Sequence, residues 1–178
     1  DELTPQVTID RLEDRALLCL PSTITLGDES AAFASARRIR SLGVRFVKIK
    51  VGRTPREDAA RVCAAVAAHP KARVILDANQ GYGPAHSLSL VRRLRARGIV
   101  PVLFEQPAEA DDLSGMAYVH RKSGIPVAAD ESLRGRGDAL QLARGKAAQV
   151  LNIKLMKMGV LEAWDCALIA RACGLKIM

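Results

Sequence analysis

The sequence alternates between short apolar runs and longer amphipathic stretches, and this alternation limits the fold more than any other feature. The apolar runs lie at 22–28, 45–52, 72–80, 100–107, 125–132 and 149–157, with the start of another at 175–178. Stretches of helical character separate them, at 29–43, 55–70, 84–97, 111–123, 137–147 and 160–173. Strands that alternate with helices of about 10–15 residues predict an α/β fold built on a parallel sheet.

Two architectures satisfy this alternation: an open doubly wound sheet and a (β/α)₈ barrel. A doubly wound sheet gathers its site at one switch point, usually beside a glycine-rich loop, and no GxGxxG or P-loop pattern follows any of these strands. Instead, one charged residue stands near the end of each successive strand, namely Lys50, Asp77, Glu105, Asp130 and Lys154. We therefore predict a (β/α)₈ TIM-type barrel with its site at the C-terminal mouth.

The chain is short for a complete barrel. A (β/α)₈ barrel usually needs about 250 residues, whereas this sequence has 178. Six strand–helix units and the start of a seventh strand account for residues 22–178. We expect an incomplete barrel whose unpaired strand edges favour aggregation or pairing with another chain. A homo-oligomer is therefore one of the alternatives.

Three of the strand-end residues, Asp77, Glu105 and Asp130, are carboxylates on consecutive strands. Carboxylates that converge without a cation repel one another, and burial favours their protonated forms. A hard divalent cation relieves the repulsion, and ligation by oxygen alone suits Mg²⁺. The alternative is that each carboxylate pairs with a basic side chain at the rim. Three carboxylates in register favour the metal.

Two lysines, Lys50 and Lys154, fall on the second and sixth strands, which stand on opposite walls of a barrel. A lysine near a metal and another ammonium has a lowered pKa and can act as a base. Asn152 shares a strand face with Lys154 because strand side chains alternate, so we expect it to orient that lysine. Glu131 follows Asp130 on the alternate face, where we expect it to brace a neighbouring lysine.

Five segments resemble, in order, the motif series of the enolase superfamily. They are KIK at 48–50, DANQGY at 77–82, FEQP at 104–107, ADES at 129–132 and NIKLMKMG at 152–159. Within that superfamily they resemble the mandelate racemase/muconate lactonizing group, and the last segment is most similar to epimerases of Ala-Glu-type dipeptides. The resemblance implies a barrel catalytic domain over 22–178 and a remnant of, or linker from, an N-terminal capping domain over 1–21.

The resemblance also assigns roles to residues at the motif positions. It implies Mg²⁺ as the cofactor, held by Asp77, Glu105 and Asp130, and two acid/base lysines, Lys50 and Lys154. It implies supporting or substrate-binding roles for Lys48, Asn79, Glu131 and Asn152.

We therefore predict an isomerase that epimerises dipeptides by two-lysine proton transfer through a metal-stabilised enolate. Alternatives on the same fold are a muconate cycloisomerase, an N-acylamino-acid racemase and an o-succinylbenzoate synthase. A non-enzyme alternative is a truncated barrel fragment that binds metal without turnover.

Composition bears on partners and compartment. The net charge of +8 owes much to arginines over 92–97, which we interpret as a solvated helix face. Only 3% of residues are aromatic and no nucleic-acid-binding motif is present, so the expected partner is a small carboxylate, not nucleic acid. No apolar run has the length of a membrane span, and four cysteines without CxxC spacing favour a reducing cytoplasm.

Overall fold

The computed structural model describes residues 22–178, so the expected capping-domain remnant over 1–21 lies outside the described residues. Seven strands form one sheet in which every pair of neighbours is parallel and the spatial order follows the chain. The strands are β1 (Ser22–Ile24), β2 (Phe46–Lys50), β3 (Arg73–Asp77), β4 (Leu103–Glu105), β5 (Val127–Ala129), β6 (Val150–Leu151) and β7 (Lys176–Ile177). A doubly wound sheet reverses its strand order at a switch point, so this sequential order excludes that alternative.

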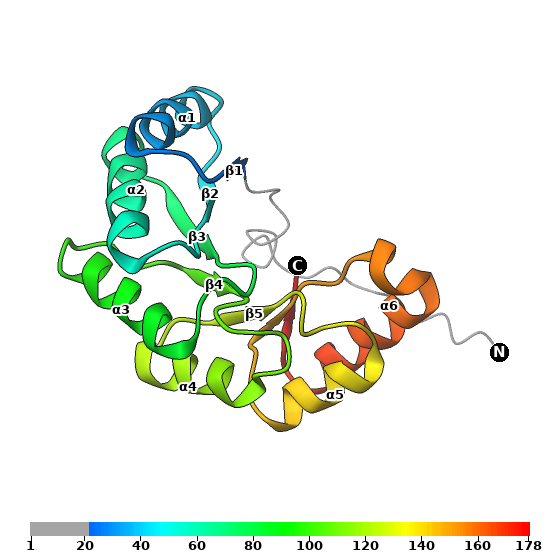
Figure 1. The fold of residues 1–178 in the computed structure, drawn as a ribbon. Helices are drawn as coiled ribbons and strands as arrows, with labels where there is room; N and C mark the ends of the chain where they lie inside the picture. Colours follow the sequence, from blue (N-terminus) through cyan, green and yellow to red (C-terminus); the bar gives the residue numbers. More distant parts are fainter. Residues whose placement is uncertain (1–21) are drawn as a thin grey trace.

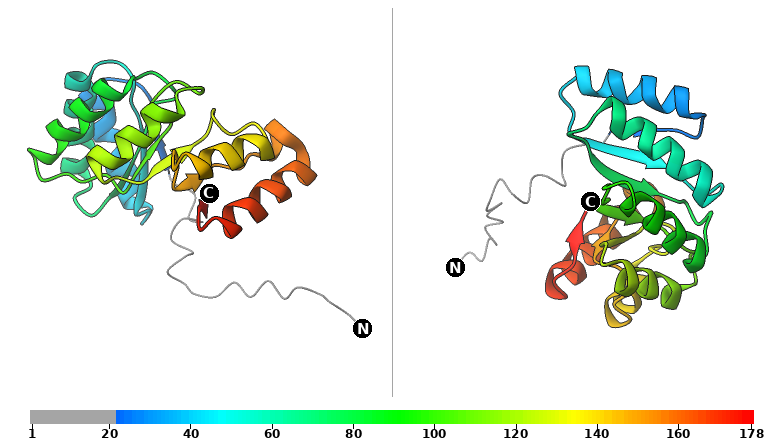
Figure 2. Two further views of the ribbon diagram at one scale, coloured as in Figure 1. Left: turned by 90° about the horizontal axis from the view of Figure 1, so that it is seen from below. Right: turned by 90° about the vertical axis from the view of Figure 1, so that its left-hand side faces the viewer.

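Six helices connect the strands and lie along the outer side of the curved sheet (Figures 1 and 2). They are α1 (Glu29–Ser41), α2 (Pro55–Ala68), α3 (Pro84–Arg95), α4 (Leu113–Ser123), α5 (Arg136–Arg144) and α6 (Leu155–Ala172). The predicted fold is confirmed: six strand–helix units and a seventh strand form part of a (β/α)₈ barrel. Within residues 22–178, β1 and β7 remain the two edges of the sheet.

Local sequence signals fix where several helices begin and end. Asp28 caps α1 by accepting a hydrogen bond from the backbone N–H of Ala31 at 2.7 Å. Thr54 caps α2 in the same way, with Pro55 as the first helical residue, where a missing N–H costs nothing. Gly124 ends α4 in the left-handed conformation, with φ of 67°.

The two faces of the sheet have different characters because strand side chains alternate. The outward face packs against the helices through buried residues such as Ile49, Leu76 and Phe104. The inward face carries a separate apolar layer of Phe46, Ile75, Leu103, Ala128 and Val150. Two residues further along, in the direction of each strand, the inward positions are polar: Lys48, Asp77, Glu105, Asp130 and Asn152. A polar layer therefore lies over an apolar floor at the C-terminal ends of the strands.

The segment after β6 differs from the prediction of a strand over 149–157. β6 itself covers only Val150–Leu151, and α6 begins at Leu155, so Met156 and Lys157 are helical. The backbone stays extended up to Lys154, which has φ of −119° and ψ of 114°. Gly159, with φ of 74°, separates the first turn from the rest of α6. An apolar run cannot by itself mark where a strand gives way to a helix.

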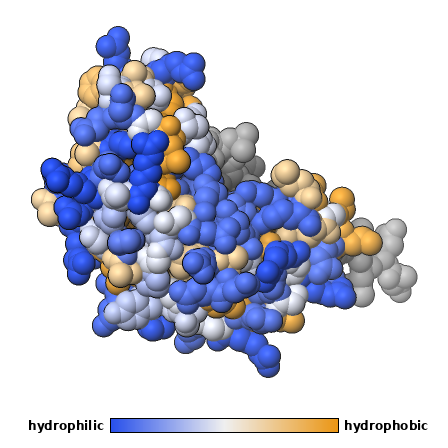
Figure 3. Space-filling view, viewed as in Figure 1, coloured by the Kyte–Doolittle hydropathy of each residue, from blue (hydrophilic) through white to orange (hydrophobic). Residues whose placement is uncertain are grey.

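The outer surface is mostly hydrophilic in the view of Figure 3, with hydrophobic residues gathered over α6. Met156 and Leu161 are 91% and 84% exposed, and Val160, Trp164 and Leu168 are exposed with them. None of the described helices is both long enough and apolar enough to cross a membrane.

Candidate active site

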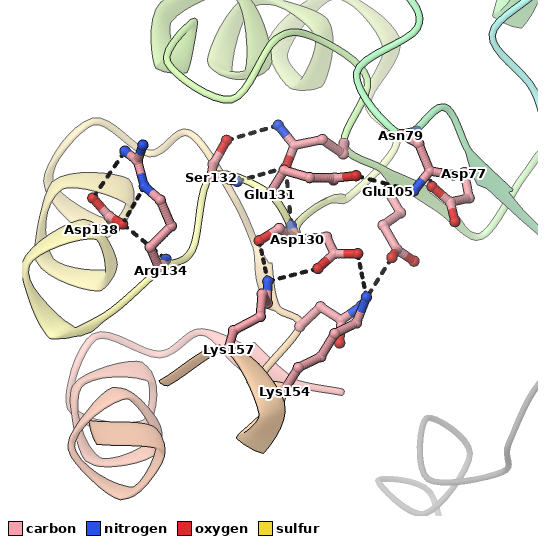
Figure 4. Close-up of polar contacts among 12 residues, drawn as sticks. Asp77, Asn79, Glu105, Asp130, Glu131, Ser132, Arg134, Asp138, Lys154 and Lys157 are labelled. Carbon is pink, nitrogen blue, oxygen red and sulfur yellow. Dashed lines mark hydrogen bonds and ion pairs between the residues drawn. The ribbon is translucent and has the colours of Figure 1, made fainter. Parts of the chain in front are cut away.

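Three carboxylates stand in a row at the C-terminal ends of β3, β4 and β5. Asp77 lies directly opposite Glu105 in the strand register, and Glu105 lies opposite Ala128, two residues before Asp130. Asp77 and Glu105 are fully buried and Asp130 is 4% exposed. Figure 4 shows the three side chains beside one another on the inner side of the sheet. The predicted grouping of these carboxylates is therefore present in the fold.

Lys48 lies between the first two carboxylates. Its Nζ is 2.9 Å from Asp77 Oδ2 and 2.8 Å from Glu105 Oε2. It also donates a hydrogen bond of 2.9 Å to Glu105 Oε1. Burial would lower the pKa of Lys48, but the charge of Glu105 and the bonds to both carboxylates outweigh it and raise that pKa. A single ammonium therefore serves two buried carboxylates.

Glu105 is not fully compensated by this arrangement. Burial and the neighbouring charge of Asp77 raise the pKa of Glu105, although Lys48 opposes the shift. Glu105 Oε2 and Asp77 Oδ2 lie at ion-pair distance from Lys48, yet neither accepts a hydrogen bond of good geometry within the described residues. Lysine ammonium groups at ion-pair distance are therefore the neighbours that offset the charge on these two buried oxygens.

Asn152 is placed by the structure in a different role from the predicted one. Its Nδ2 donates to Glu105 Oε1 at 2.9 Å, so it orients the central carboxylate and not Lys154. The prediction assumed a partner on the same strand. The nearest acceptor instead lies across the inner face of the sheet, on β4.

Asp130 is paired with two lysines. Lys154 contacts Oδ2 at 2.5 Å, while Lys157 donates to Oδ1 at 2.7 Å and to the backbone carbonyl at 2.6 Å. Burial would raise the pKa of Asp130, but these bonds outweigh burial and lower it. Lys157 was not among the site residues predicted from the sequence. Because α6 begins at Leu155, Lys157 lies in its first turn, where its backbone N–H donates to the carbonyl oxygen of Lys154 at 3.0 Å, and both side chains reach Asp130.

Lys50 occupies the other end of the carboxylate row. Its Nζ is 2.8 Å from Asp77 Oδ2, and it donates a hydrogen bond to Asn79 Oδ1. Asn79 in turn donates to Glu131 Oε1 at 3.1 Å. Glu131 makes no ion pair among residues 22–178. The expectation that Glu131 braces a lysine directly is therefore wrong, because the Asn79 amide stands between it and Lys50.

Gln106 supports the row from the helix side of the sheet and was not singled out from the sequence. It is fully buried, and its side-chain carbonyl accepts from the backbone N–H groups of Asp130, at 3.0 Å, and Ser132, at 3.1 Å. Its amide donates to Ser132 Oγ and to the carbonyl of Ala108. Its φ of 40° is uncommon for a residue other than glycine, and such strain persists where the surroundings hold the backbone in place.

The row is thus bracketed by cations. Lys50 pairs with the first carboxylate, Lys48 bridges the first and second, and Lys154 pairs with the third. As the side chains stand, no three His, Cys, Asp or Glu residues in the described part of the chain form a group that could hold a metal ion. Lysine ammonium groups supply positive charge beside each of the three carboxylates.

A family model, enolase C-terminal domain-like, matches residues 31–178, which is most of the chain. The chain belongs to the enolase C-terminal domain-like family. This confirms the resemblance drawn from the five motifs, and all of the strand-end residues discussed above lie inside the matched range.

Two curated relatives of this chain are epimerases. An aromatic dipeptide epimerase from Herpetosiphon aurantiacus is 45% identical over 88% of this chain and 44% of its own length. An L-Ala-D/L-Glu epimerase from Thermotoga maritima is 38% identical over 80% of this chain and 41% of its own. The chain therefore spans less than half the length of these relatives.

Solved structures show the same fold. A mandelate racemase/muconate lactonizing enzyme from Roseiflexus sp. has a TM-score of 0.86 and 46% identity, covering 89% of this chain and 47% of that one. A dipeptide epimerase from Enterococcus faecalis V583, complexed with Mg and the dipeptide L-Leu-L-Tyr, has a TM-score of 0.82 and 32% identity. That match covers 92% of this chain and 48% of the other.

Proposed function

We propose that this chain is the barrel portion of a Mg²⁺-dependent dipeptide epimerase. The observation that carries the proposal is the placement of two lysines at opposite ends of one row of buried carboxylates. Lys50 contacts the first carboxylate, Asp77, and Lys154 contacts the third, Asp130. Two amines on either side of a cation site can address opposite faces of one substrate carbon.

The residues present fit Mg²⁺ by the chemistry of their donor set. Asp77, Glu105 and Asp130 offer oxygen ligands alone, which hard cations prefer. Asp77 Oδ2 and Glu105 Oε2 are buried oxygens that lie at ion-pair distance from lysines but accept no hydrogen bond of good geometry within the described residues. The Enterococcus faecalis relative, whose structure contains Mg and a dipeptide, supports the same assignment. When bound, Mg²⁺ would supply the positive charge that offsets negative charge developing at the substrate carboxylate.

The two lysines carry out the proton transfers. One lysine, as the neutral amine, removes the proton from the α-carbon next to the substrate carboxylate and becomes an ammonium. The other, as the ammonium, delivers a proton to the opposite face of that carbon and becomes the amine. The configuration at the carbon is inverted and the protonation states of the two lysines are exchanged. The reverse reaction restores them.

Lys48 and Asn79 hold this arrangement in place. Lys48 keeps Asp77 and Glu105 together against their mutual repulsion. Asn79 accepts from Lys50 and donates to Glu131, which limits the directions in which the Lys50 amine can point. Holding reacting groups in a productive geometry is itself a large part of a rate enhancement.

The experiment is α-proton exchange in deuterium oxide with Mg²⁺, using the full-length protein that carries this segment. The substrates are each epimer of an Ala-Glu dipeptide, of an aromatic dipeptide, of an N-acyl amino acid and of a muconate-like acid. We expect exchange with inversion on dipeptides, with the Ala-Glu type first as the NIKLMKMG segment indicates. Inversion should fall at least about 100-fold in Lys50→Ala and in Lys154→Ala.

The two variants should differ in what they retain. Each should still exchange the α-proton of the one epimer that faces its remaining lysine, and the two variants should retain opposite epimers. Intact racemisation and exchange in both variants would overturn the two-lysine mechanism. Mg²⁺ binding without exchange on any acid would favour the non-enzyme alternative.

A further inference from the structure

A buried ion pair lies directly behind Lys50, on α2. Arg61 Nη1 contacts Asp58 Oδ1 at 2.7 Å, and the exposed fractions of the two side chains are 3% and 0%. Neither side chain belongs to the polar layer at the mouth of the barrel. Their remaining bonds go to backbone groups at or just after the ends of β1 and β2 and to the hydroxyl of Tyr82.

Arg61 holds the ends of two strands. Its Nη1 donates to the carbonyl oxygen of Lys50 at 2.9 Å, and its Nη2 donates to the carbonyl oxygen of Thr25 at 2.9 Å. Lys50 is the last residue of β2, and Thr25 follows the last residue of β1. A planar guanidinium presents its donors in a fixed fork, so these two carbonyls are held at a defined separation.

Asp58 holds the backbone immediately after Lys50. Its Oδ2 accepts from the N–H of Gly52 at 2.8 Å and of Arg53 at 2.9 Å, and also from the hydroxyl of Tyr82. Tyr82 comes from the loop after β3, which carries Asn79. The ion pair therefore ties the carbonyl of Lys50, the two N–H groups that follow it and the next loop into one unit.

Close backbone packing leaves this unit little room to shift. A Cβ on Gly81 would lie 3.0 Å from both Gly52 Cα and Gly52 O, so the two loops touch backbone to backbone. Gly52 has φ of 123°, which other residues rarely adopt. The path of the chain that leaves Lys50 is thus fixed on both sides.

Stability alone does not account for such a network. A buried ion pair is often replaceable by apolar side chains of similar size without loss of stability, because the cost of removing both charges from water offsets their attraction. Apolar side chains cannot, however, form directed hydrogen bonds with the carbonyl of Lys50. What the ion pair adds beyond stability is therefore a fixed position for Lys50.

We propose that Arg61 and Asp58 are positioning residues that fix where the Lys50 amine meets the substrate. The inference rests on the proposed two-lysine function. The Lys50 amine contacts Asp77 and Asn79, so the position of the Lys50 backbone decides from where its four-carbon side chain reaches the site. Lys154 approaches from the start of α6 and is not bonded to this network, so a disturbance at Arg61 acts on one of the two lysines only.

The experiment compares Arg61→Met and Arg61→Lys with the wild type in the full-length protein. Exchange and inversion are measured from each epimer of the preferred dipeptide in deuterium oxide with Mg²⁺. In Arg61→Met we expect inversion to fall about 100-fold, as for a misplacement of about 1 Å. The epimer that faces Lys154 should still exchange within about threefold of wild type. Arg61→Lys keeps the charge, so its rate of inversion should fall between those of the wild type and Arg61→Met.

His69 offers a matched control in the same strand–helix unit. It caps the opposite end of α2, and its Nε2 donates to the carbonyl oxygen of Val44 at 2.8 Å, near the start of β2. His69 is buried, at 6% exposed. His69→Met therefore removes a comparable side-chain-to-carbonyl bond away from the mouth. It should lower the melting temperature while leaving the exchange pattern of both epimers unchanged.

The outcomes separate the inference from the function beneath it. A wild-type protein without exchange on any acid contradicts the proposed function. A wild type that exchanges, with Arg61→Met slowing both epimers equally or neither, overturns the positioning role and leaves the function standing. If Arg61→Met does not fold, Tyr82→Phe removes a single donor to Asp58, and it should lower inversion about threefold to tenfold with the same preference between epimers.

Discussion

Lys48 is the side chain whose removal tests the electrostatics of the site most directly. Its side chain is 13% exposed, and its ammonium lies between two carboxylates that are fully buried. Lys48→Met keeps a side chain of similar length but leaves Asp77 and Glu105 facing each other across adjacent strands without that cation. We expect the metal-free variant to be less stable than the wild type by about 2–3 kcal/mol at pH 7.

The magnitude follows from the cheapest way to relieve the repulsion, which is to protonate Glu105. Its ordinary pKa is 4.5. Protonation at pH 7 therefore spans 2.5 pH units at about 1.4 kcal/mol each, or at most about 3.5 kcal/mol. Part of this cost is already present in the wild type, because burial and Asp77 raise the pKa of Glu105. The added loss should shrink by about 1.4 kcal/mol for each pH unit below 7.

Chemical denaturation in EDTA at several values between pH 5 and pH 8 measures this loss. Lys48→Arg keeps the charge and serves as the control, with an expected change below about 1 kcal/mol. Mg²⁺ at about 100 times its Kd should return about 2.7 kcal/mol to the Met variant. A Met variant as stable as the wild type at every pH would refute the reasoning, since the two carboxylates would then need no cation between them.

Two further results are expected. Gln106→Ala removes the acceptor for the backbone N–H groups of Asp130 and Ser132 and should lower the free energy of unfolding by about 3 kcal/mol. Gln80→Ala frees only the N–H of Ala110 and should cost about half as much. Equal losses for the two variants in chemical denaturation would contradict the role of Gln106. Because the pKa of Glu105 is raised, protons compete with Mg²⁺ for this carboxylate in mildly acidic solution. Calorimetry should therefore show Mg²⁺ affinity rising with pH above 4.5 until Glu105 is fully ionised. A Mg²⁺ affinity that does not change with pH would contradict this.

The strand–helix order and the polar layer could be predicted from the sequence because both depend on local periodicity. Alternation within a strand places Lys48 and Lys50 on one face, and the next strand repeats the pattern with Asp77. In a parallel sheet the C-terminal ends of successive strands meet at one edge, so carboxylates at those ends become neighbours. No knowledge of side-chain packing was needed for this part of the site.

Partner choice could not be predicted in the same way. Asn152 donates to Glu105 on β4 and not to Lys154, and Glu131 contacts Asn79 and not a lysine. Both outcomes depend on which acceptor the curvature of the sheet brings within about 3 Å. The apolar run after β6 likewise gave no sign that the helix begins at Leu155, which places Lys157 on Asp130.

The sequence by itself determined the fold class, the family and the row of carboxylates with a lysine beyond each end, since these follow from spacing along the chain. Only the tertiary structure decided how each charge is compensated and which backbone groups are held by Arg61, Asp58 and Gln106. The bonds from Arg61 and Asp58 to backbone groups join residues between 5 and 36 positions apart. Their energies depend on distance and direction in space, and the order of residues along the chain does not specify either.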